Sequence, residues 1–230
     1  MSAQEVKAAS RVSSAVEDYA KAIYALESRE PGTAVSTNAL ADRLGVTPAS
    51  ASNMVKKLDA LGLVSHVPYH GVQLTAAGVR VALEVLRHHR LLELYLAETL
   101  GVPWDRVHDE AEVLEHVLSE ELEELIATKL GNPTHDPHGD PIPTRDGRVA
   151  EGSTESLQGL EIGAAGCFVR ISDSDPDMLR YLGDRGIAPG AMFEVVDKQP
   201  FDGPLFVRFG EDVHVIGGAL ARAMRVEVTA

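Results

Sequence analysis

A segment rich in proline, glycine and aspartate divides this chain of 230 residues into a part with helical periodicity and a part with short β-type runs. It extends from Gly131 to Leu157 and contains Asn-Pro, Asp-Pro, Pro-Ile-Pro and Asp-Gly, which favour turns over regular structure. We interpret the segment as a linker rather than a packed element. The expected fold is therefore mainly α with a small β domain.

The first 74 residues are typical of a winged helix-turn-helix. Gly45 lies between two short helical patterns and predicts a tight turn there. Thr47 is the expected cap of the second helix, and Pro48 is its first-turn proline. Two β-type runs around Pro68-Tyr69-His70 complete the pattern as a wing. The predicted helices cover residues 16–26, 36–44 and 47–61, and the predicted strands cover residues 63–67 and 71–74.

Two longer apolar-striped patterns predict helices over residues 75–100 and about 109–130. Behind a small DNA-binding head, such helices form a dimer interface more often than the core of a monomer. We therefore expect a homodimer.

The last part predicts a small barrel of SH3-like type, because five short strands occur in about 70 residues. The predicted strands are 167–171, 192–196, 205–209, 213–216 and 224–228, with a helix over 176–182. The expected domains are a winged helix-turn-helix (1–74), a helical metal-binding and dimerisation domain (75–140), a linker (141–160) and the SH3-like domain (161–230).

Charge is distributed unevenly along the chain. Residues 1–90 carry ten Lys and Arg against eight Asp and Glu, whereas residues 91–230 carry eleven against twenty-seven. Only the first part therefore tolerates a phosphate backbone. The single cysteine, Cys167, excludes an internal disulfide framework and a Cys-rich zinc site. The chain has no long apolar run and no signal-peptide pattern, so we expect a cytoplasmic protein with no membrane partner.

The helix predicted over residues 47–61 is the second helix of the helix-turn-helix. We expect it to be the recognition helix, because the second helix of this motif enters the major groove. Its small polar residues permit close approach to base edges, and its lysines and the wing residues suit phosphate or sugar contacts. The lysine pair alone is equally consistent with ordinary solvated charges. The candidate DNA-binding residues are Thr47, Ala49, Ser50, Asn53, Lys56, Lys57, Tyr69 and His70.

The segment from His108 to His116 carries the strongest chemical signal. In a helix, Glu112, Glu115 and His116 project from one face, and mixed oxygen and nitrogen donors suit a fairly hard divalent ion. By itself the segment leaves open a solvated Glu-rich face. His89 and Glu93, four residues apart on the preceding helix, favour the metal interpretation.

These features together resemble the metal-dependent repressors of the DtxR/MntR family, and most closely its three-domain manganese-responsive regulators of actinobacteria. The resemblance covers nearly the whole chain. It rests on the winged-helix head, the barrel-like tail, and the segments Arg87-His-His-Arg-Leu-Leu-Glu93, Val107-His-Asp-Glu-Ala-Glu-Val-Leu-Glu-His116 and Gly139-Asp-Pro-Ile-Pro143.

The resemblance implies two metal sites in each subunit. A primary site would use Asp18, Glu112, Glu115 and His116, and an ancillary site would use His89, Glu93 and His108. The tail domain of three-domain members donates ligands as well, and Asp175 falls where a carboxylate is expected, whereas Met178 falls where an amide is usual. Lys21 replaces a ligand that the two-domain manganese regulators have, which assigns the second ion to the ancillary site.

The family also bears on the choice of metal. In its iron-responsive branch the positions of Asp18 and Glu112 are Met and Cys, which are soft sulfur donors, whereas here both are carboxylates. The expected cofactor is Mn(II), two per subunit, for which Fe(II), Co(II) or other divalent ions can substitute.

The resemblance therefore implies a Mn(II)-dependent repressor of manganese homeostasis genes that binds a palindromic double-stranded operator as a homodimer. It implies no enzyme activity and no small-molecule substrate. Three alternatives stay open at this stage: an iron(II)-responsive repressor of the same family, a metalloenzyme that uses the carboxylate and histidine cluster, and a winged-helix factor whose acidic half recruits another protein.

Overall fold

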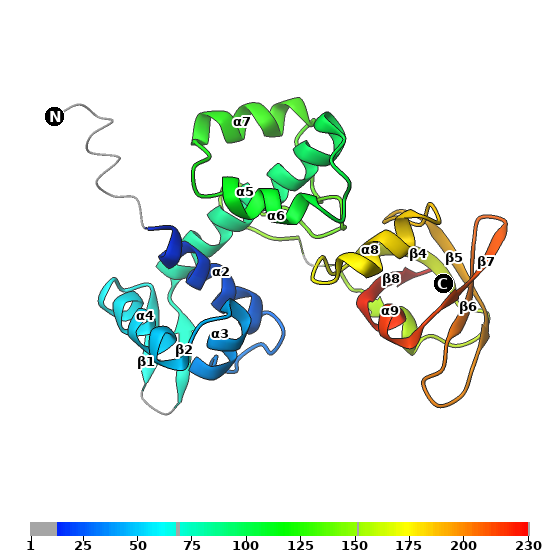
Figure 1. The fold of residues 1–230 in the computed structure, drawn as a ribbon, viewed down its shortest axis with the longest axis horizontal. Helices are drawn as coiled ribbons and strands as arrows, with labels where there is room; N and C mark the ends of the chain where they lie inside the picture. Colours follow the sequence, from blue (N-terminus) through cyan, green and yellow to red (C-terminus); the bar gives the residue numbers. More distant parts are fainter. Residues whose placement is uncertain (1–12, 68–69, 151, 230) are drawn as a thin grey trace. The chain divides into compact units, whose positions relative to one another are not determined.

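The computed structural model describes residues 13–67, 70–150 and 152–229. The chain divides into two compact units, residues 1–88 with 143–147, and residues 89–142 with 148–230. Figure 1 traces the helices and strands along the chain. No helix in the described ranges has the length and apolar character needed to cross a membrane.

The first unit contains the predicted winged helix-turn-helix. Gly45 adopts a left-handed conformation at φ 63°, which ends one helix sharply, and Thr47 Oγ1 then accepts a hydrogen bond from Ser50 N to begin the next. The helices pack on one apolar core that includes Ile23, Leu40 and Leu58. The elements are α2 (Ser14–Glu27), α3 (Thr37–Leu44), α4 (Pro48–Ala60), β1 (Val64–Val67) and β2 (Gly71–Leu74), all as predicted to within a few residues.

The long helix α5 (Ala76–Leu100) is confirmed and contributes residues to both units. The single helix expected over 109–130 is wrong, because the structure has two helices there, α6 (Val107–Leu114) and α7 (Glu120–Lys129). Ser119 Oγ accepts a hydrogen bond from Leu122 N and so caps a new helix start. This cap satisfies one backbone donor that the interruption leaves free.

The expected unpacked linker is wrong in its first part, because residues 131–142 pack into the second unit. Asp136, His138 and Ile142 are buried. Asp136 Oδ1 accepts hydrogen bonds from His138 N at 2.8 Å and Asp140 N at 2.9 Å, so the turn satisfies its own polar groups. A turn-rich segment can be buried when its backbone donors have such partners.

Gly139 allows this turn to lie directly against the β part of the unit. Its φ is +86°, and a Cβ atom there would lie 1.9 Å from Val169 O. Only glycine fits such an approach. Beside it, Ile171 N donates to His138 O at 2.9 Å, which fixes the end of β4 (Ala165–Ile171) to the turn.

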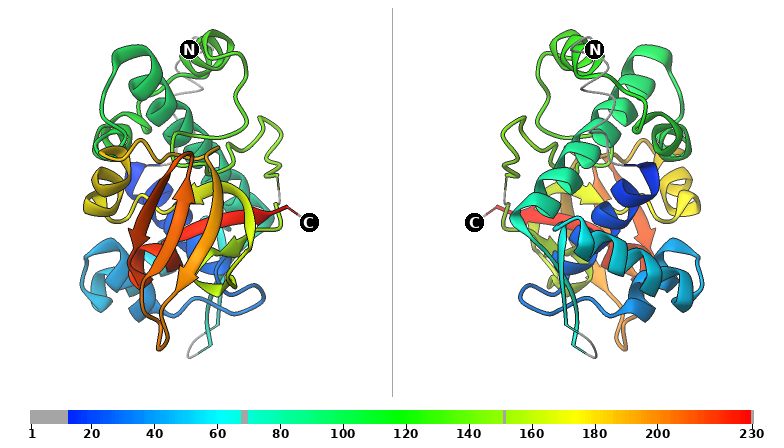
Figure 2. Two further views of the ribbon diagram at one scale, coloured as in Figure 1. Left: turned by 90° about the vertical axis from the view of Figure 1, so that its right-hand side faces the viewer. Right: turned by 90° about the vertical axis from the view of Figure 1, so that its left-hand side faces the viewer.

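A six-stranded antiparallel sheet forms the β part, and its core includes Phe168, Val195 and Val207. The orange and red strands of this sheet face the viewer in the left view of Figure 2. The pairing order β3-β8-β4-β5-β6-β7 is linear, so among the described residues β3 and β7 are the edge strands of this SH3-like sheet. The remaining elements are β3 (Glu155–Ser156), the 3-10 helix η1 (Leu157–Gly159), α8 (Pro176–Gly183), β5 (Met192–Lys198), β6 (Leu205–Phe209), β7 (Asp212–Ile216), α9 (Gly218–Ala223) and β8 (Met224–Val228).

The five predicted strands and the predicted helix α8 are confirmed. The sequence prediction missed β3 and α9. The strand β3 has two residues and α9 has six, so neither is long enough for a periodic apolar pattern.

Candidate metal centre

Two buried side chains on α5 begin the cluster. His89 and Glu93 lie one helical turn apart, and His89 Nε2 is 3.0 Å from Glu93 Oε1. Their side chains are 5% and 1% exposed. A carboxylate removed from water in this way needs charged or hydrogen-bonding partners. The pair therefore marks a place where further polar groups, or a cation, must be present.

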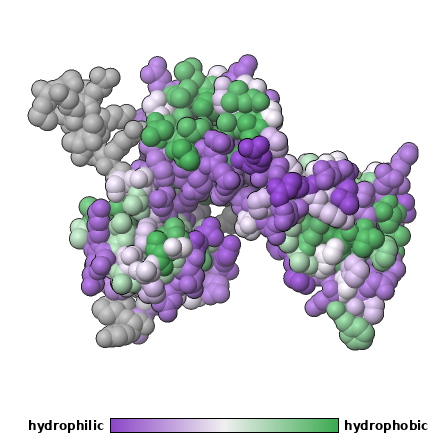
Figure 3. Space-filling view, viewed as in Figure 1, coloured by the Kyte–Doolittle hydropathy of each residue, from purple (hydrophilic) through white to green (hydrophobic). Residues whose placement is uncertain are grey.

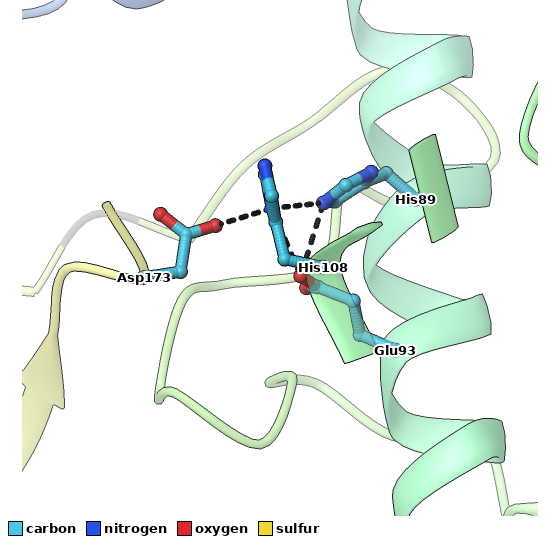
Figure 4. Close-up of side chains that lie close together, drawn as sticks. All are labelled: His89, Glu93, His108 and Asp173. Carbon is cyan, nitrogen blue, oxygen red and sulfur yellow. Dashed lines mark hydrogen bonds and ion pairs between the residues drawn. The ribbon is translucent and has the colours of Figure 1, made fainter. Parts of the chain in front are cut away.

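His108 from α6 and Asp173 from the segment after β4 supply such partners, and Figure 4 shows the four side chains converging. His108 Nδ1 lies 3.2 Å from His89 Nε2, 3.5 Å from Glu93 Oε1 and 2.9 Å from Asp173 Oδ2. Elements distant in the sequence thus bring two imidazoles and two carboxylates within reach of one position.

The charges of this group depend on one another. The hydrogen bond to Asp173 and then that to Glu93 raise the pKa of His108 to about 10. Burial would raise the pKa of Glu93, but hydrogen bonds from His108 and His89 outweigh it and hold that pKa well below its usual range. For Asp173 the same competition between burial and the His108 hydrogen bond lowers the pKa. Protonated His108 therefore balances two carboxylates in the protein without metal.

A second donor group shares Glu93. Glu93, Asp136 and His138 are all buried, and one ligand atom from each lies within 4.8 Å of the others. His138 Nε2 donates to Trp104 O at 2.8 Å, and its other ring nitrogen, Nδ1, is buried without a hydrogen-bond partner among the described residues and lies 3.8 Å from Glu93 Oε2. A histidine that donates one N–H to a carbonyl has its other nitrogen oriented for metal binding.

Burial and neighbouring charges make Asp136 costly as an anion. Burial, then Asp140 and Glu93, raises the pKa of Asp136 well above its usual range, against the opposing effect of Arg90. Burial also raises the pKa of Asp140. An added cation near these carboxylates would favour their ionised forms.

A third group contains the predicted primary-site residues of the second unit. Glu115 Oε2 lies 2.5 Å from His89 Nδ1, and Glu112 Oε1 lies 3.8 Å from both His89 Nδ1 and His108 Nε2. His116 Nε2 lies 3.6 Å from Glu115 Oε1. Although α6 ends at Leu114, the structure still places Glu112 and Glu115 beside His89, and His116 beside Glu115. Asp18 is on α2 in the first unit and is partly buried.

The donor set fits a divalent metal ion. Its donors are imidazole nitrogens and carboxylate oxygens, and the unpartnered Nδ1 of His138 is the type of donor that such an ion binds. Among the described residues no cysteine belongs to these groups, and Met178 packs against the core of the sheet.

The tail-domain carboxylate that reaches the cluster is Asp173, not the expected Asp175. Asp175 caps α8, where its Oδ1 accepts hydrogen bonds from Asp177 N at 3.0 Å and Met178 N at 3.4 Å. Ser-Asp-Ser-Asp at 172–175 contains both carboxylates, so the sequence could not choose between them, although Asp before Pro176 is the pattern of a helix cap.

Sequence reasoning also missed Asp136 and His138. The signal was Asp-Pro-His at 136–138 inside the proline-rich segment. Its composition predicts a linker, and a linker places its polar side chains in water.

The candidate DNA-binding residues lie in the first unit. Ala49, Ser50, Asn53, Lys56 and Lys57 are exposed on α4, and His70 is exposed before β2. Tyr69 lies outside the described residues. Thr47 is the N-cap of α4, so its hydroxyl is already engaged with Ser50.

Family models match three consecutive parts of the chain. The iron-dependent repressor N-terminal DNA-binding domain matches residues 11–72, and the iron-dependent repressor metal-binding and dimerisation domain matches residues 75–144. The FeoA domain matches residues 155–228.

Relatives match along nearly the whole length. The iron-dependent repressor IdeR of Mycobacterium leprae is 31% identical over 224 residues, which is 92% of this chain and 96% of that one. The diphtheria toxin repressor of Corynebacterium diphtheriae is 32% identical over 222 residues, with the same shares of both chains.

Solved structures agree with this relationship. A manganese-dependent transcriptional repressor in complex with manganese has a TM-score of 0.85 and 41% identity, and the match covers 93% of this chain and 100% of that one. The manganese regulator SloR has a TM-score of 0.73 and 29% identity, with coverage of 93% and 98%. This chain therefore belongs to the iron-dependent repressor (DtxR/MntR) family of metal-dependent transcriptional repressors, which are DNA-binding proteins and not enzymes.

Proposed function

We propose that the protein is a Mn(II)-responsive repressor of manganese homeostasis genes. The observation that carries the proposal is the donor set of the centre, which among the described residues contains carboxylates and imidazoles and no cysteine. Oxygen-rich donors suit Mn(II), while thiolate and thioether donors favour later transition metals. Structural relatives named for manganese support this choice, whereas IdeR and the diphtheria toxin repressor, named for iron or for a toxin, leave iron as the alternative.

Two ions per subunit are proposed. The first would be held by Asp18, Glu112, Glu115 and His116, as the family resemblance implies. The second would be held by Glu93 with His89, His108 and Asp173, and with His138 and Asp136 within reach through the other oxygen of Glu93. When bound, the ion supplies positive charge that offsets the carboxylates.

In this proposal, residues of both units link metal binding to DNA affinity. Asp18 belongs to the DNA-binding unit, whereas Glu112, Glu115 and His116 belong to the other unit. Without a cation these carboxylates repel one another, which disfavours any arrangement that brings them together. A ligand present at 100 times its dissociation constant favours the arrangement that binds it by about 2.7 kcal/mol, enough to change DNA affinity about a hundredfold.

The expected target is a palindromic operator bound by a homodimer. In this proposal α4 enters the major groove, with Ser50 and Asn53 at base edges and Lys56 and Lys57 at phosphates. These residues are exposed on α4, which is what such contacts require.

The test is a DNA-binding titration with several metals. Operator duplexes are first selected from a random pool, in parallel, with protein loaded with Mn(II) in air and with Fe(II) under anaerobic conditions. Binding is then measured against buffered free Mn(II), Fe(II), Co(II) and Zn(II), with and without chelator. We expect full activation by Mn(II) and its reversal by chelator. Activation by Fe(II) but not by Mn(II) would assign the protein to iron, and binding that chelator does not change would remove the metal from the mechanism.

A further inference from the structure

Arg90 is a mostly buried cation beside the second donor group, which consists of Glu93, Asp136 and His138. Its side chain is 15% exposed, and it lies on α5 next to His89. Arg90 Nε is 3.7 Å from Asp136 Oδ2, and its Nη2 is 3.5 Å from Asp140 Oδ1. Its Nη1 donates to Pro141 O. One guanidinium thus contacts the turn of residues 136–141 at three points.

The two carboxylate oxygens of Asp136 have different partners. Oδ1 accepts from His138 N and Asp140 N and holds the turn together, while Oδ2 faces Arg90. Asp136 is also one of the three donors grouped with Glu93 and His138. A metal ion in that group and the guanidinium of Arg90 would therefore compete for the same carboxylate.

We propose that Arg90 is a resident competitor of the metal ion, a positioning residue that acts through Asp136 and sets the metal concentration at which this part of the centre fills. The inference rests on the proposed function, because it requires a divalent ion at the Glu93, Asp136 and His138 group.

The charge of Arg90 lowers the metal affinity of this group in two ways. Arginine keeps its positive charge at any working pH, so it repels a bound divalent ion across Asp136. Arginine also stabilises the metal-free protein, since its charge offsets part of the cost of burying the Asp136 carboxylate. Both effects lower metal affinity, and both disappear when the charge of Arg90 is removed.

The chain offers a local reporter for this group. Trp104 is the only tryptophan in the sequence. Its ring stacks on His138 with centroids 5.8 Å apart and an angle of 21° between the planes, and its carbonyl accepts the hydrogen bond from His138 Nε2. Its fluorescence is therefore expected to report on events at His138.

The experiment compares Arg90→Gln, Arg90→Lys and Arg170→Met in the full chain. Gln removes the charge but keeps a donor for Pro141 O, and Lys keeps the charge. Arg170 contacts Asp140 at 3.4 Å and is the matched control, because its loss removes one charge without freeing Asp136. Trp104 fluorescence is titrated with Mn(II) in a competing chelator, and thermal unfolding is recorded with and without Mn(II).

We expect Arg90→Gln to bind Mn(II) at this group at least about tenfold more tightly than the natural protein, with a lower unfolding temperature when metal-free. Arg90→Lys should restore an affinity close to the natural one, and Arg170→Met should change it far less than Arg90→Gln. An Arg90→Gln protein that folds only when Mn(II) is added would also support the inference.

Three outcomes would overturn it. Unchanged or weaker Mn(II) affinity in folded Arg90→Gln would show that Arg90 does not compete. Failure of this variant to fold even with Mn(II) would make Arg90 purely structural. A natural protein whose Trp104 signal does not respond to Mn(II) would remove the second ion from the proposed function itself, while operator binding could still depend on the other ion.

Discussion

At the scale of single residues, the protonation state of a histidine beside carboxylates determines the charge of the metal-free centre. His108 is held protonated by Asp173 and Glu93, so a proton occupies part of the charge balance that a metal ion would take over. Because histidine binds metal only in its neutral form, the proton must leave when the metal binds.

This exchange predicts a pH dependence for the metal-free protein. The pKa of His108 is about 10 when folded against 6.5 for the free side chain, so protonated His108 stabilises the fold. That stabilisation is complete below about pH 6.5 and is lost as the pH rises toward 10. The unfolding temperature of chelator-treated protein should therefore fall between about pH 6.5 and 9.5, less steeply in His108→Gln. A rise over this range would contradict the assignment.

Asp173 and Asp175 lie two residues apart and provide a test variant and its control. We expect Asp173→Asn to weaken Mn(II) binding at the cluster of His89, Glu93, His108 and Asp173 by at least about tenfold, because a neutral amide replaces an anionic donor. Asp175→Asn should leave it nearly unchanged, since asparagine caps helices as well as aspartate does. Fluorescence of Trp104 under Mn(II) titration measures both variants. Equal losses would mean that α8, and not Asp173, determines binding.

The carboxylate of Glu112 is expected to contribute to the preference for Mn(II) over later transition metals. Replacing it with cysteine introduces a soft thiolate, so Glu112→Cys should lower the Mn(II) response of operator binding and raise the response to Co(II) or Fe(II). Glu110→Cys is the control, because Glu110 is exposed on the same helix. The ratio of half-activating Mn(II) and Co(II) concentrations is the measurement. The same ratio in both variants would show that a new thiol on α6 is sufficient by itself.

At the scale of elements, the break between α6 and α7 leaves apolar side chains exposed. Figure 3 shows hydrophobic surface gathered around α7. The exposed large side chains of these helices and the segment between them are Val113, Leu114, Val117, Leu122 and Leu125. Exposed apolar surface of this kind marks an interaction site, and the family model for this region is a dimerisation domain.

We therefore expect Val117→Glu to weaken the dimer. Val117 is 69% exposed in the single chain, and burying a charged side chain against a second copy would be unfavourable. The molar mass from light scattering should move toward that of a monomer, and operator affinity should fall with it. Val213→Glu is the control, because Val213 is 45% exposed on the edge strand β7 of the sheet. If both variants stay dimeric, another surface forms the interface.

On the scale of the whole molecule, Asp18 tests whether metal links the DNA-binding unit to the rest. Asp18→Ala should preserve folding, dimer mass and the Trp104 response, because Asp18 belongs to the first unit while Trp104 and His138 belong to the second. It should abolish the stimulation of operator binding by Mn(II), with Glu17→Ala as the neighbouring control. Undiminished stimulation in Asp18→Ala, measured by fluorescence anisotropy with the selected operator, would contradict the proposed first site.

The sequence by itself determined the local architecture. Gly45 with Thr47-Pro48 defined the helix-turn-helix, and the alternation of short β-type runs with turns defined the sheet, since caps, turns and periodicity act over a few residues. The pairing of His89 with Glu93 was equally visible, because helical spacing brings residues four apart onto one face.

Only the tertiary structure decided which distant groups complete the centre. Asp173 rather than Asp175 reaches His108, and Asp136 and His138 are buried in a segment whose composition indicates a loop. Such contacts depend on how β4 and the 136–140 turn pack against α5, through Gly139 at Val169 O and Ile171 N at His138 O. No local preference encodes them, because a few buried hydrogen bonds and one close glycine contact position groups that lie far apart in the chain.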